Sequence, residues 1–282
     1  MIPSEFDYAV PESLDEALQM LSSGGEDAKL LAGGHSLLPL MKLRLAAPTL
    51  LVDLRRVPGL GGVQRENGVF RIGAMTRHAM LQDTKELGVV ATAAHRIADQ
   101  QVRNRGTIGG SLAHGDPASD LPAVMLATEA TLTARGGSGQ REIAAGDLFL
   151  DYLTTSLEPD EVITEIRVPA MENYGFGYEK FTRRAEDWAM VGVTALISAR
   201  DGTCEDVRVG LTHMASVPLR ATAVEDALRG QQLDAQSIAT AAEAAAEGTD
   251  PPGDLNATPD YKRHLARVLT RRALERAAGL TD

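Results

Sequence analysis

Cysteine, histidine and aromatic residues are scarce in this 282-residue chain, which has one cysteine, six histidines and 4% aromatic residues. The single thiol, Cys204, excludes an internal disulfide. It also excludes an iron–sulfur cluster held by this chain alone, because such a cluster usually takes four thiolates. The histidines, at positions 35, 78, 95, 114, 213 and 264, never fall three to five residues apart. We therefore expect no metal site, since zinc-binding helices place two histidines at that spacing.

Basic residues are outnumbered, with 28 Lys and Arg against 39 Asp and Glu, and long apolar runs are scarce. The formal net charge of −11 argues against nucleic acid or an anionic membrane as the main partner, because both would repel the chain. No apolar run approaches the roughly 18 residues of a membrane span. The first residues also lack the basic and apolar regions of a signal peptide. We expect a cytoplasmic protein with no membrane span.

The common nucleotide-binding fingerprints are missing too. No stretch fits GxGxxG, because Gly175 and Gly177 are followed by Lys180 where the third glycine should stand. No P-loop sequence occurs either. These absences disfavour a Rossmann domain and a P-loop domain.

Two glycine-rich segments are present instead. The first, Leu30–Ser36, ends in Gly-Gly-His-Ser, and the second, residues 104–120, contains Gly109 and Gly110. Adjacent glycines permit either a sharp turn or the close approach of a ligand. Two such segments about seventy residues apart suit a ligand with two phosphates, because backbone N–H groups can reach a pyrophosphate from two sides.

The hydrophobic pattern predicts an α+β chain of two domains. One lobe starts with a helix behind a capping box of Ser13 and Glu16, and continues through strands at 29–32 and 50–53 and a helix at 37–45. A hairpin around Asn67–Gly68 opens a second lobe. Its later elements are helices at 87–99 and 121–127 and strands at 130–134 and 162–168. From about residue 175 the pattern changes to three strands, at 176–183, 191–199 and 207–213, followed by alanine-rich helices.

Arginines repeat along the last predicted helix. Arg263, Arg267 and Arg271 are four residues apart and therefore share one helix face. This face is either solvated or a docking surface for an acidic partner.

Three motifs carry a resemblance to a known family. The sequences Ala32–Ser36, Thr107–Gly110 and Ser119–Ala123 resemble the pyrophosphate loops and flavin-side aspartate of the FAD-binding medium subunits of molybdenum hydroxylases, the xanthine dehydrogenase family. By motif, the carbon monoxide dehydrogenase type is the most similar. The resemblance implies a two-lobed FAD-binding domain of the p-cresol methylhydroxylase type over residues 1–175, with lobes at about 1–55 and 56–175. A smaller domain, 176–282, would hold a three-stranded sheet and a helical bundle.

The same resemblance implies a set of cofactor-binding residues. Residues 32–36 and 107–110 would take the pyrophosphate, and Asp120 the ribityl or flavin side. Leu157 and Lys180 match flavin-edge positions, and Trp188 is the aromatic residue of a segment that covers one face of the ring. The full set is Leu31, Ala32, Gly33, Gly34, His35, Ser36, Leu37, Thr107, Ile108, Gly109, Gly110, His114, Asp120, Leu157, Lys180, Asp187 and Trp188.

Two histidines in this set have more than one interpretation. In some oxidases of the same broad fold, a histidine placed like His35 is bonded covalently to the flavin. In molybdenum hydroxylases the flavin is held without a bond, and the resemblance favours that noncovalent mode here. His114 is either a second ligand contact or an ordinary loop residue.

The function implied by the resemblance is electron transfer within a larger assembly. One partner, a large subunit, would hold the molybdenum cofactor, and a small subunit would hold 2Fe–2S clusters, assembled as a dimer of heterotrimers. FAD on this chain would collect electrons and pass them to an external acceptor, so no catalytic acid or base is required. The alternatives are a self-contained FAD-dependent oxidase and a scaffold that has lost flavin. The substrate of the assembly, whether carbon monoxide, an aldehyde, a purine or another N-heterocycle, and the electron acceptor stay open.

Overall fold

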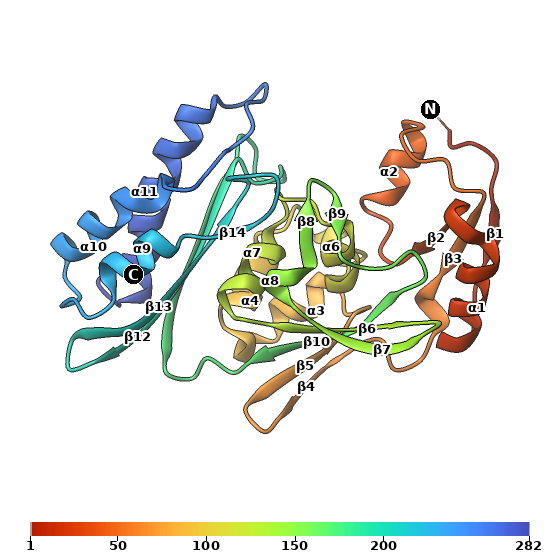
Figure 1. Ribbon diagram of the computed structural model, residues 1–282, viewed down its shortest axis with the longest axis horizontal. Helices are drawn as coiled ribbons and strands as arrows, with labels where there is room; N and C mark the ends of the chain where they lie inside the picture. Colours follow the sequence, from red (N-terminus) through yellow and green to blue (C-terminus); the bar gives the residue numbers. More distant parts are fainter. Residues whose placement is uncertain (1, 282) are drawn as a thin grey trace.

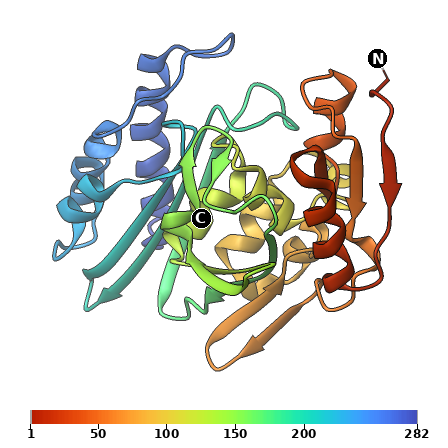
Figure 2. The same cartoon turned by 45° about the vertical axis from the view of Figure 1, so that its right-hand side comes forward.

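A computed structural model describes residues 2–281, so Met1 and Asp282, the outermost residues of the two predicted domains, lie outside the described residues. The first lobe is a parallel three-stranded sheet of strand order β1-β3-β2 with helices beside it. Figures 1 and 2 place this lobe at the opposite end of the molecule from the C-terminal helices. Its elements are β1 (Asp7–Ala9), α1 (Leu14–Gly24), η1 (Gly25–Asp27), β2 (Ala28–Leu31), α2 (Leu37–Lys42), β3 (Leu50–Asp53) and η2 (Leu54–Arg56).

The start of α1 differs in detail from the predicted capping box. The Ser13 hydroxyl accepts from the Glu16 amide, as an N-cap should. The Glu16 carboxylate, however, accepts from the amide of Glu12 rather than that of Ser13. The second predicted helix is also shorter than expected, because the chain turns after Lys42 and Arg44 takes a left-handed conformation with φ of 61°.

The second lobe is built on an antiparallel five-stranded sheet, in the order β4-β5-β10-β6-β7. Asn67 and Gly68 both have positive φ, which confirms the predicted type I′ hairpin between the first two of these strands. The strands are β4 (Val63–Glu66), β5 (Val69–Gly73), β6 (Thr131–Gly136), β7 (Gly139–Ala144) and β10 (Val162–Pro169). A separate hairpin is formed by β8 (Phe149–Asp151) and β9 (Thr154–Thr155).

Helices cover one face of this sheet and form the largest core. They are α3 (His78–Asp83), η3 (Lys85–Leu87), α4 (Val89–His95), α5 (Gln100–Arg103), α6 (Ile108–His114), α7 (Asp120–Ala127) and α8 (Ala145–Leu148). All eight residues of α7 are buried, because it lies between two sheets and contacts the C-terminal domain on its far side (Figure 1). The same core includes Tyr178 and Leu196 from that domain.

The C-terminal domain has an antiparallel sheet covered by helices. The sheet contains β11 (Tyr174–Phe181), β12 (Val191–Arg200), β13 (Thr203–Thr212) and β14 (Leu219–Arg220), so it has four strands rather than the predicted three. The extra strand was missed because two residues carry no periodicity. The helices are α9 (Thr222–Leu228), α10 (Ala235–Ala242), η4 (Glu243–Ala246) and α11 (Pro259–Ala277). None of the helices within residues 2–281 is both long and apolar enough to cross a bilayer.

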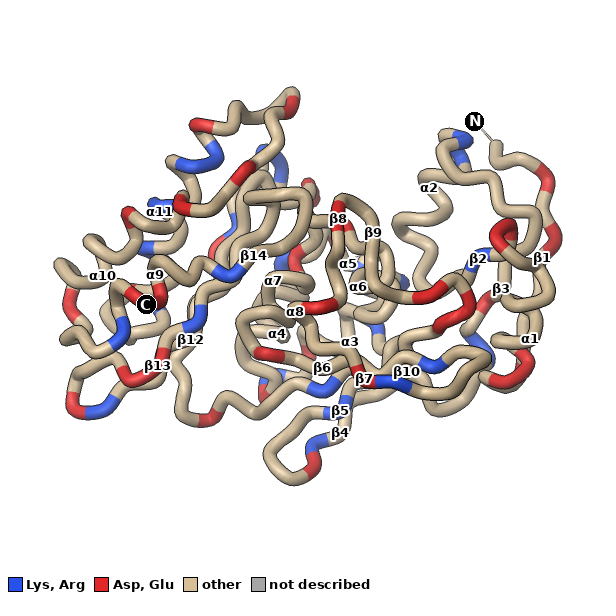
Figure 3. The backbone as a smooth tube through the Cα atoms, viewed as in Figure 1, with Lys and Arg blue, Asp and Glu red and all other residues tan. Residues whose placement is uncertain are grey.

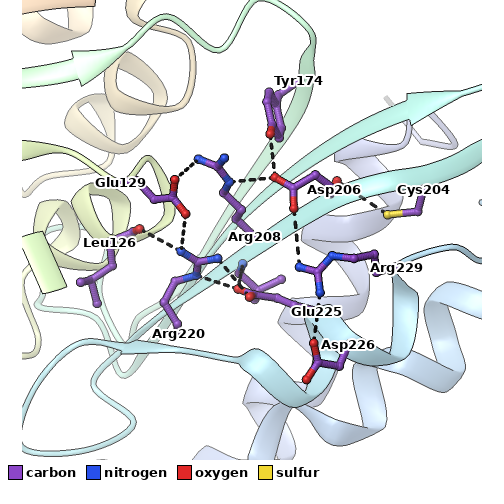
Figure 4. A network of polar contacts seen from close by, with 11 residues as sticks. Leu126, Glu129, Tyr174, Cys204, Asp206, Arg208, Arg220, Glu225, Asp226 and Arg229 are labelled. Carbon is purple, nitrogen blue, oxygen red and sulfur yellow. Dashed lines mark hydrogen bonds and ion pairs between the residues drawn. The ribbon is translucent and has the colours of Figure 1, made fainter.

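A polar network joins the second lobe to this domain, as Figure 4 shows. Glu129, two residues beyond α7, forms ion pairs with Arg208 of β13 at 3.0 Å and with Arg220 of β14 at 3.5 Å. The Arg220 guanidinium also makes a two-pronged pair with the buried carboxylate of Glu225 and donates to the carbonyl of Leu126. Bidentate pairing of this kind fixes geometry as well as adding energy. The sheet is therefore held against the end of α7.

Charged residues of both signs are interspersed over the helices of the C-terminal domain (Figure 3). Arg263 pairs with Asp260 at 3.1 Å, Arg267 with Glu243 at 3.6 Å and Arg271 with Glu275 at 2.7 Å. Each arginine of the repeat thus has an acidic neighbour on its own chain. This arrangement supports a solvated face over a docking surface for an acidic partner.

Candidate functional site

A cavity of about 430 Å³ brings the two glycine-rich segments together. Its volume lies in the range of small-molecule and cofactor sites. All of Leu31–Leu37 line it, together with Thr107, Gly109 and Gly110. Four further predicted residues, His114, Asp120, Leu157 and Trp188, also line it, whereas Ile108, Lys180 and Asp187 do not. Fourteen of the predicted residues therefore meet around one space.

The first segment offers free backbone donors to this cavity. It leaves the parallel sheet after Leu31 and enters α2 at Leu37, and Gly34 has a left-handed φ of 77°. Among residues 2–281, no oxygen accepts a hydrogen bond from the amides of residues 34–37. Consecutive amides around one left-handed residue form a concave anion-binding nest. This segment therefore fits a phosphate group.

The second segment is constructed differently from the predicted loop. Gly109 and Gly110 lie in the first turn of α6, and the amides of residues 108–110 already donate to Thr76 O, Ala74 O and Thr107 Oγ1. A β-carbon on Gly109 would lie 2.6 Å from that of Ala74. These glycines are thus explained by close packing and not by amides that reach the cavity. Thr107 and Ser111, at the start of α6, still line the space.

The two segments touch each other directly. A β-carbon on Gly33 would lie 2.5 Å from the carbonyl oxygen of Arg105 and 2.6 Å from the Cα of Gly106. A β-carbon on Gly110 would lie 3.5 Å from that of Ala32. Any side chain at position 33 would force the lobes apart, so glycine at this position sets the width of the cavity.

Asp120, Tyr178 and Lys180 form a buried polar cluster at one wall of the cavity. The ammonium of Lys180 donates to Asp120 Oδ2 at 2.9 Å and to the carbonyl of Arg96 at 3.0 Å, and the Tyr178 hydroxyl donates to Asp120 Oδ1 at 2.5 Å. Burial raises the pKa of Asp120 despite the adjacent ammonium, and burial together with the Asp120 charge raises that of Tyr178 well above its usual value. Lys180, predicted at the flavin edge, lies behind Asp120 and does not itself line the cavity.

Histidines occupy three positions around the cavity. His35 and His114 line it as predicted, and burial lowers the pKa of His114. Sequence reasoning missed His78, the first residue of α3, which also lines it. Its ring faces Gly106 and its buried Nδ1 has no hydrogen-bond partner. Burial, with smaller contributions from His35 and Arg103, lowers the pKa of His78 to about 4, so the ring is neutral at pH 7. A lone histidine without a neighbouring motif gave no sequence signal.

Trp188 belongs to the loop between β11 and β12 and borders two spaces. It lines the first cavity and also a second one of about 1030 Å³, which Asp187, Tyr152 and His213 line too. The carboxylate of Asp187 accepts from the Arg184 amide, which closes a turn within the loop. The chain leaves the strand after Phe181, and residues 182–190 form a loop before β12.

Metal ligands are not assembled in the described part of the chain. Residues 2–281 contain no group of three or more His, Cys, Asp or Glu side chains that could hold a metal ion. The one cysteine, Cys204, is buried, and burial raises the pKa of its thiol to about 11. A thiol with such a pKa is unreactive at neutral pH.

The chain matches two family models that together span nearly all of it. Residues 4–171 match the FAD-binding domain in molybdopterin dehydrogenase, and residues 176–277 match the C-terminal domain of CO dehydrogenase flavoprotein. The carbon monoxide dehydrogenase medium chain of Hydrogenophaga pseudoflava is 43% identical over 98% of both chains. A 6-hydroxypseudooxynicotine dehydrogenase complex subunit alpha of Paenarthrobacter nicotinovorans is 39% identical over 98% of this chain and 96% of that one.

Solved structures give the same picture. A carbon monoxide dehydrogenase of Hydrogenophaga pseudoflava that lacks the Mo-pyranopterin moiety has a chain 44% identical to this one, with a TM-score of 0.96 over 100% of both chains. Quinoline 2-oxidoreductase of Pseudomonas putida 86 has a chain that is 34% identical, with a TM-score of 0.94 over 99% of both. The likeness therefore extends across both domains and the cavity between the lobes.

Proposed function

Because this chain belongs to the family of FAD-binding medium subunits of molybdenum hydroxylases, we propose that it holds FAD noncovalently in the cavity and relays electrons within a heteromeric complex. The observation that carries the proposal is that the two glycine-rich segments meet at one cavity, where the amides of residues 34–37 have no acceptor among residues 2–281. FAD, when bound, supplies redox chemistry with one or two electrons. The chain itself supplies binding, orientation and electrostatics.

The residues present fit a pyrophosphate on the side of the first segment. The amides of residues 34–37 have no acceptor among residues 2–281, and all four residues, Ser36 and His35 included, line the cavity. Gly33 keeps a side chain out of the contact between the lobes, and Gly109 keeps one out of the packing of α6 against Ala74. Backbone donors cost no side-chain entropy when they bind an anion, which makes them suited to a tightly held cofactor.

Asp120 and Trp188 would serve the flavin side. Asp120 is held by Lys180 and Tyr178, so its position at the cavity wall is fixed before any ligand arrives. Trp188 offers a flat aromatic surface at the edge of the same cavity, and stacking on such a surface contributes about 1 kcal/mol. Leu157 adds an apolar contact. Lys180 and Asp187 then support these walls and do not touch the cofactor.

Partner chains would supply the remaining redox centres. A large subunit would carry the molybdenum cofactor and oxidise the substrate, and a small subunit would carry 2Fe–2S clusters. One cysteine on this chain is too few for a cluster, which supports a separate electron donor. Copurification from the native host tests this part: a complex well above 30.0 kDa containing both chain types supports it, and a catalytically complete monomer refutes it.

A glycine substitution tests the cavity assignment. Gly33→Ala should lower FAD affinity by roughly ten-fold, because overpacking of a tight contact costs about 1–3 kcal/mol. Gly61→Ala is the matched control, since a β-carbon there meets no atom within 4 Å. Flavin content of the purified variants gives the answer, and acid precipitation of the parent chain should release the flavin. Colour that stays in the pellet would indicate a bond to His35. Equal flavin content in folded Gly33→Ala would reject the assignment.

A further inference from the structure

His213 stands at a junction of three chain segments in an unusual conformation. It follows β13 directly and has a φ of 63°, a left-handed value that residues other than glycine seldom adopt. Its amide donates to the carbonyl of Pro117 at 2.9 Å. The ring nitrogens lie 2.8 Å from the Ala189 carbonyl and 3.3 Å from the ammonium of Lys262. The backbone amide and both ring nitrogens of His213 therefore each have a hydrogen-bond partner.

The partners of the ring determine its proton positions. A carbonyl oxygen can only accept, so Nδ1 carries the hydrogen that reaches Ala189, and Nε2 accepts from Lys262. The Lys262 side chain is fully buried and also donates to Asp254 Oδ2 at 2.7 Å. Burial first, and then the Lys262 charge, lower the pKa of His213, which keeps this neutral tautomer at physiological pH. The carboxylate, the ammonium and the imidazole form one directional chain from α11 to the β11–β12 loop.

The two carbonyls that His213 holds belong to segments beside the cavities: Ala189 lines the second cavity, and Pro117 lies between Asp116 and Ala118, which also line it. Ala189 follows Trp188, and Pro117 precedes Asp120 by three residues. Trp188 is 55% exposed, so core packing does not fix its indole. The turn at residues 184–187 closes the loop only on itself. The loop has two further anchors, since the Met190 amide donates to the Phe181 carbonyl and Arg183 donates to Asn256, but neither reaches the segment before α7. Among the hydrogen bonds of residues 2–281, those of His213 link the indole segment to the segment leading into α7.

We propose that His213 is a positioning residue that fixes Trp188 relative to Asp120, with Lys262 and Asp254 locking its ring in the required orientation. The consequence for bound flavin rests on the function proposed above, but the positioning itself does not. Trp188 is the only tryptophan of the chain, so its intrinsic fluorescence reports on this loop without any cofactor.

Acrylamide quenching and anisotropy decay of Trp188 in the flavin-free full chain test the proposal. His213→Gly removes the ring without straining the left-handed backbone, and it should lower the ratio of ordered to loosened loop by about five-fold, the effect of one net hydrogen bond. Quenching should rise and the fast component of the anisotropy decay should grow. His213→Asn should restore values near those of the parent, because its amide nitrogen replaces Nδ1 and asparagine tolerates positive φ.

Asp201→Gly is the matched control, because it introduces glycine at another left-handed position, in the turn between β12 and β13. It should leave Trp188 unchanged. Lys262→Met tests separately whether Lys262 holds the ring of His213, because it removes the donor to Nε2. It should also increase quenching, and it provides the test if His213→Gly does not fold. Unchanged quenching and anisotropy in either folded variant, His213→Gly or Lys262→Met, would overturn the proposal.

Discussion

The buried pair of Asp120 and Lys180 gives the sharpest prediction for stability. Their side chains are 3% and 2% exposed, and the charged atoms are 2.9 Å apart. At an effective dielectric constant of about 20 the attraction is about 6 kcal/mol, most of which offsets the desolvation of two charges. Removal of one partner leaves the other buried without its counterion, which typically costs 3–5 kcal/mol. We therefore expect Lys180→Met to lower the free energy of unfolding by about 4 kcal/mol.

The matched partner variant is Asp120→Asn, which keeps an acceptor for the Tyr178 hydroxyl while it removes the charge. Alone, it should also destabilise the chain, because the ammonium of Lys180 loses its counterion. Combined with Lys180→Met, it should cost clearly less than the sum of the single changes, by about 3 kcal/mol, since no unpaired charge is then buried. This difference isolates the interaction between the two side chains.

Thermal and urea unfolding, followed by circular dichroism, measure these effects. A loss of about 4 kcal/mol corresponds to a decrease of roughly 10 °C in the midpoint for a chain of this size. The control is Arg200→Met, whose exposed pair with Glu205 should contribute less than about 1 kcal/mol. If Lys180→Met costs no more than this control, or if the double variant is additive, the reasoning that Lys180 and Asp120 form a desolvated pair is wrong.

Two more predictions concern the cavity. The pKa of folded His78 is about 4, below the ordinary value of about 6.5, so the unfolded chain binds more protons between these values and stability falls as the pH drops from 7 to 4. This one residue should account for up to about 3 kcal/mol of that loss, and His78→Gln should flatten the pH dependence of urea unfolding by that amount; parallel curves would contradict it. Trp188→Ala should brighten the fluorescence of bound flavin and weaken FAD binding by about five-fold, the loss of one stacking contact, and identical emission and affinity would place the indole outside the flavin site.

Local signals in the sequence were sufficient for much of the fold. The Asn67–Gly68 pair predicted its hairpin because only residues that tolerate positive φ suit that turn. The long strands at 191–199 and 207–213 were recognisable from their apolar pattern: β12 includes the first, and β13 includes the second except for His213. The two-residue strand β14 and the three-residue strand β1 were not predicted, since elements this short contain too few side chains to establish a period.

Most residues that line the cavity could be predicted from the sequence, but the contacts that they make could not. The paired glycines correctly marked residues of one cavity, yet both pairs were expected to present free amides. The amides of Gly109 and Gly110 are instead satisfied by Ala74 and Thr107, and for Gly109 this depends on where a distant strand ends. The contact of Lys180 with Asp120 joins residues 60 positions apart, which no local pattern reveals. His78 was missed for a similar reason, because its significance arises only from burial against Gly106.

Helix α7 connects the wall of the cavity to the sheet of the C-terminal domain, so that domain contributes to the site. The helix begins at Asp120 on the cavity wall and ends beside Glu129, which holds Arg208 and Arg220 of the C-terminal sheet. Its eight residues are all buried and span only about 12 Å, too short and too tightly packed to bend independently. Tyr178 and Leu196 complete the core of the second lobe from the other side of the sequence change near residue 175. That change therefore marks a boundary in sequence pattern but not in packing, and a shift of the C-terminal sheet must move Asp120 and the cavity wall with it.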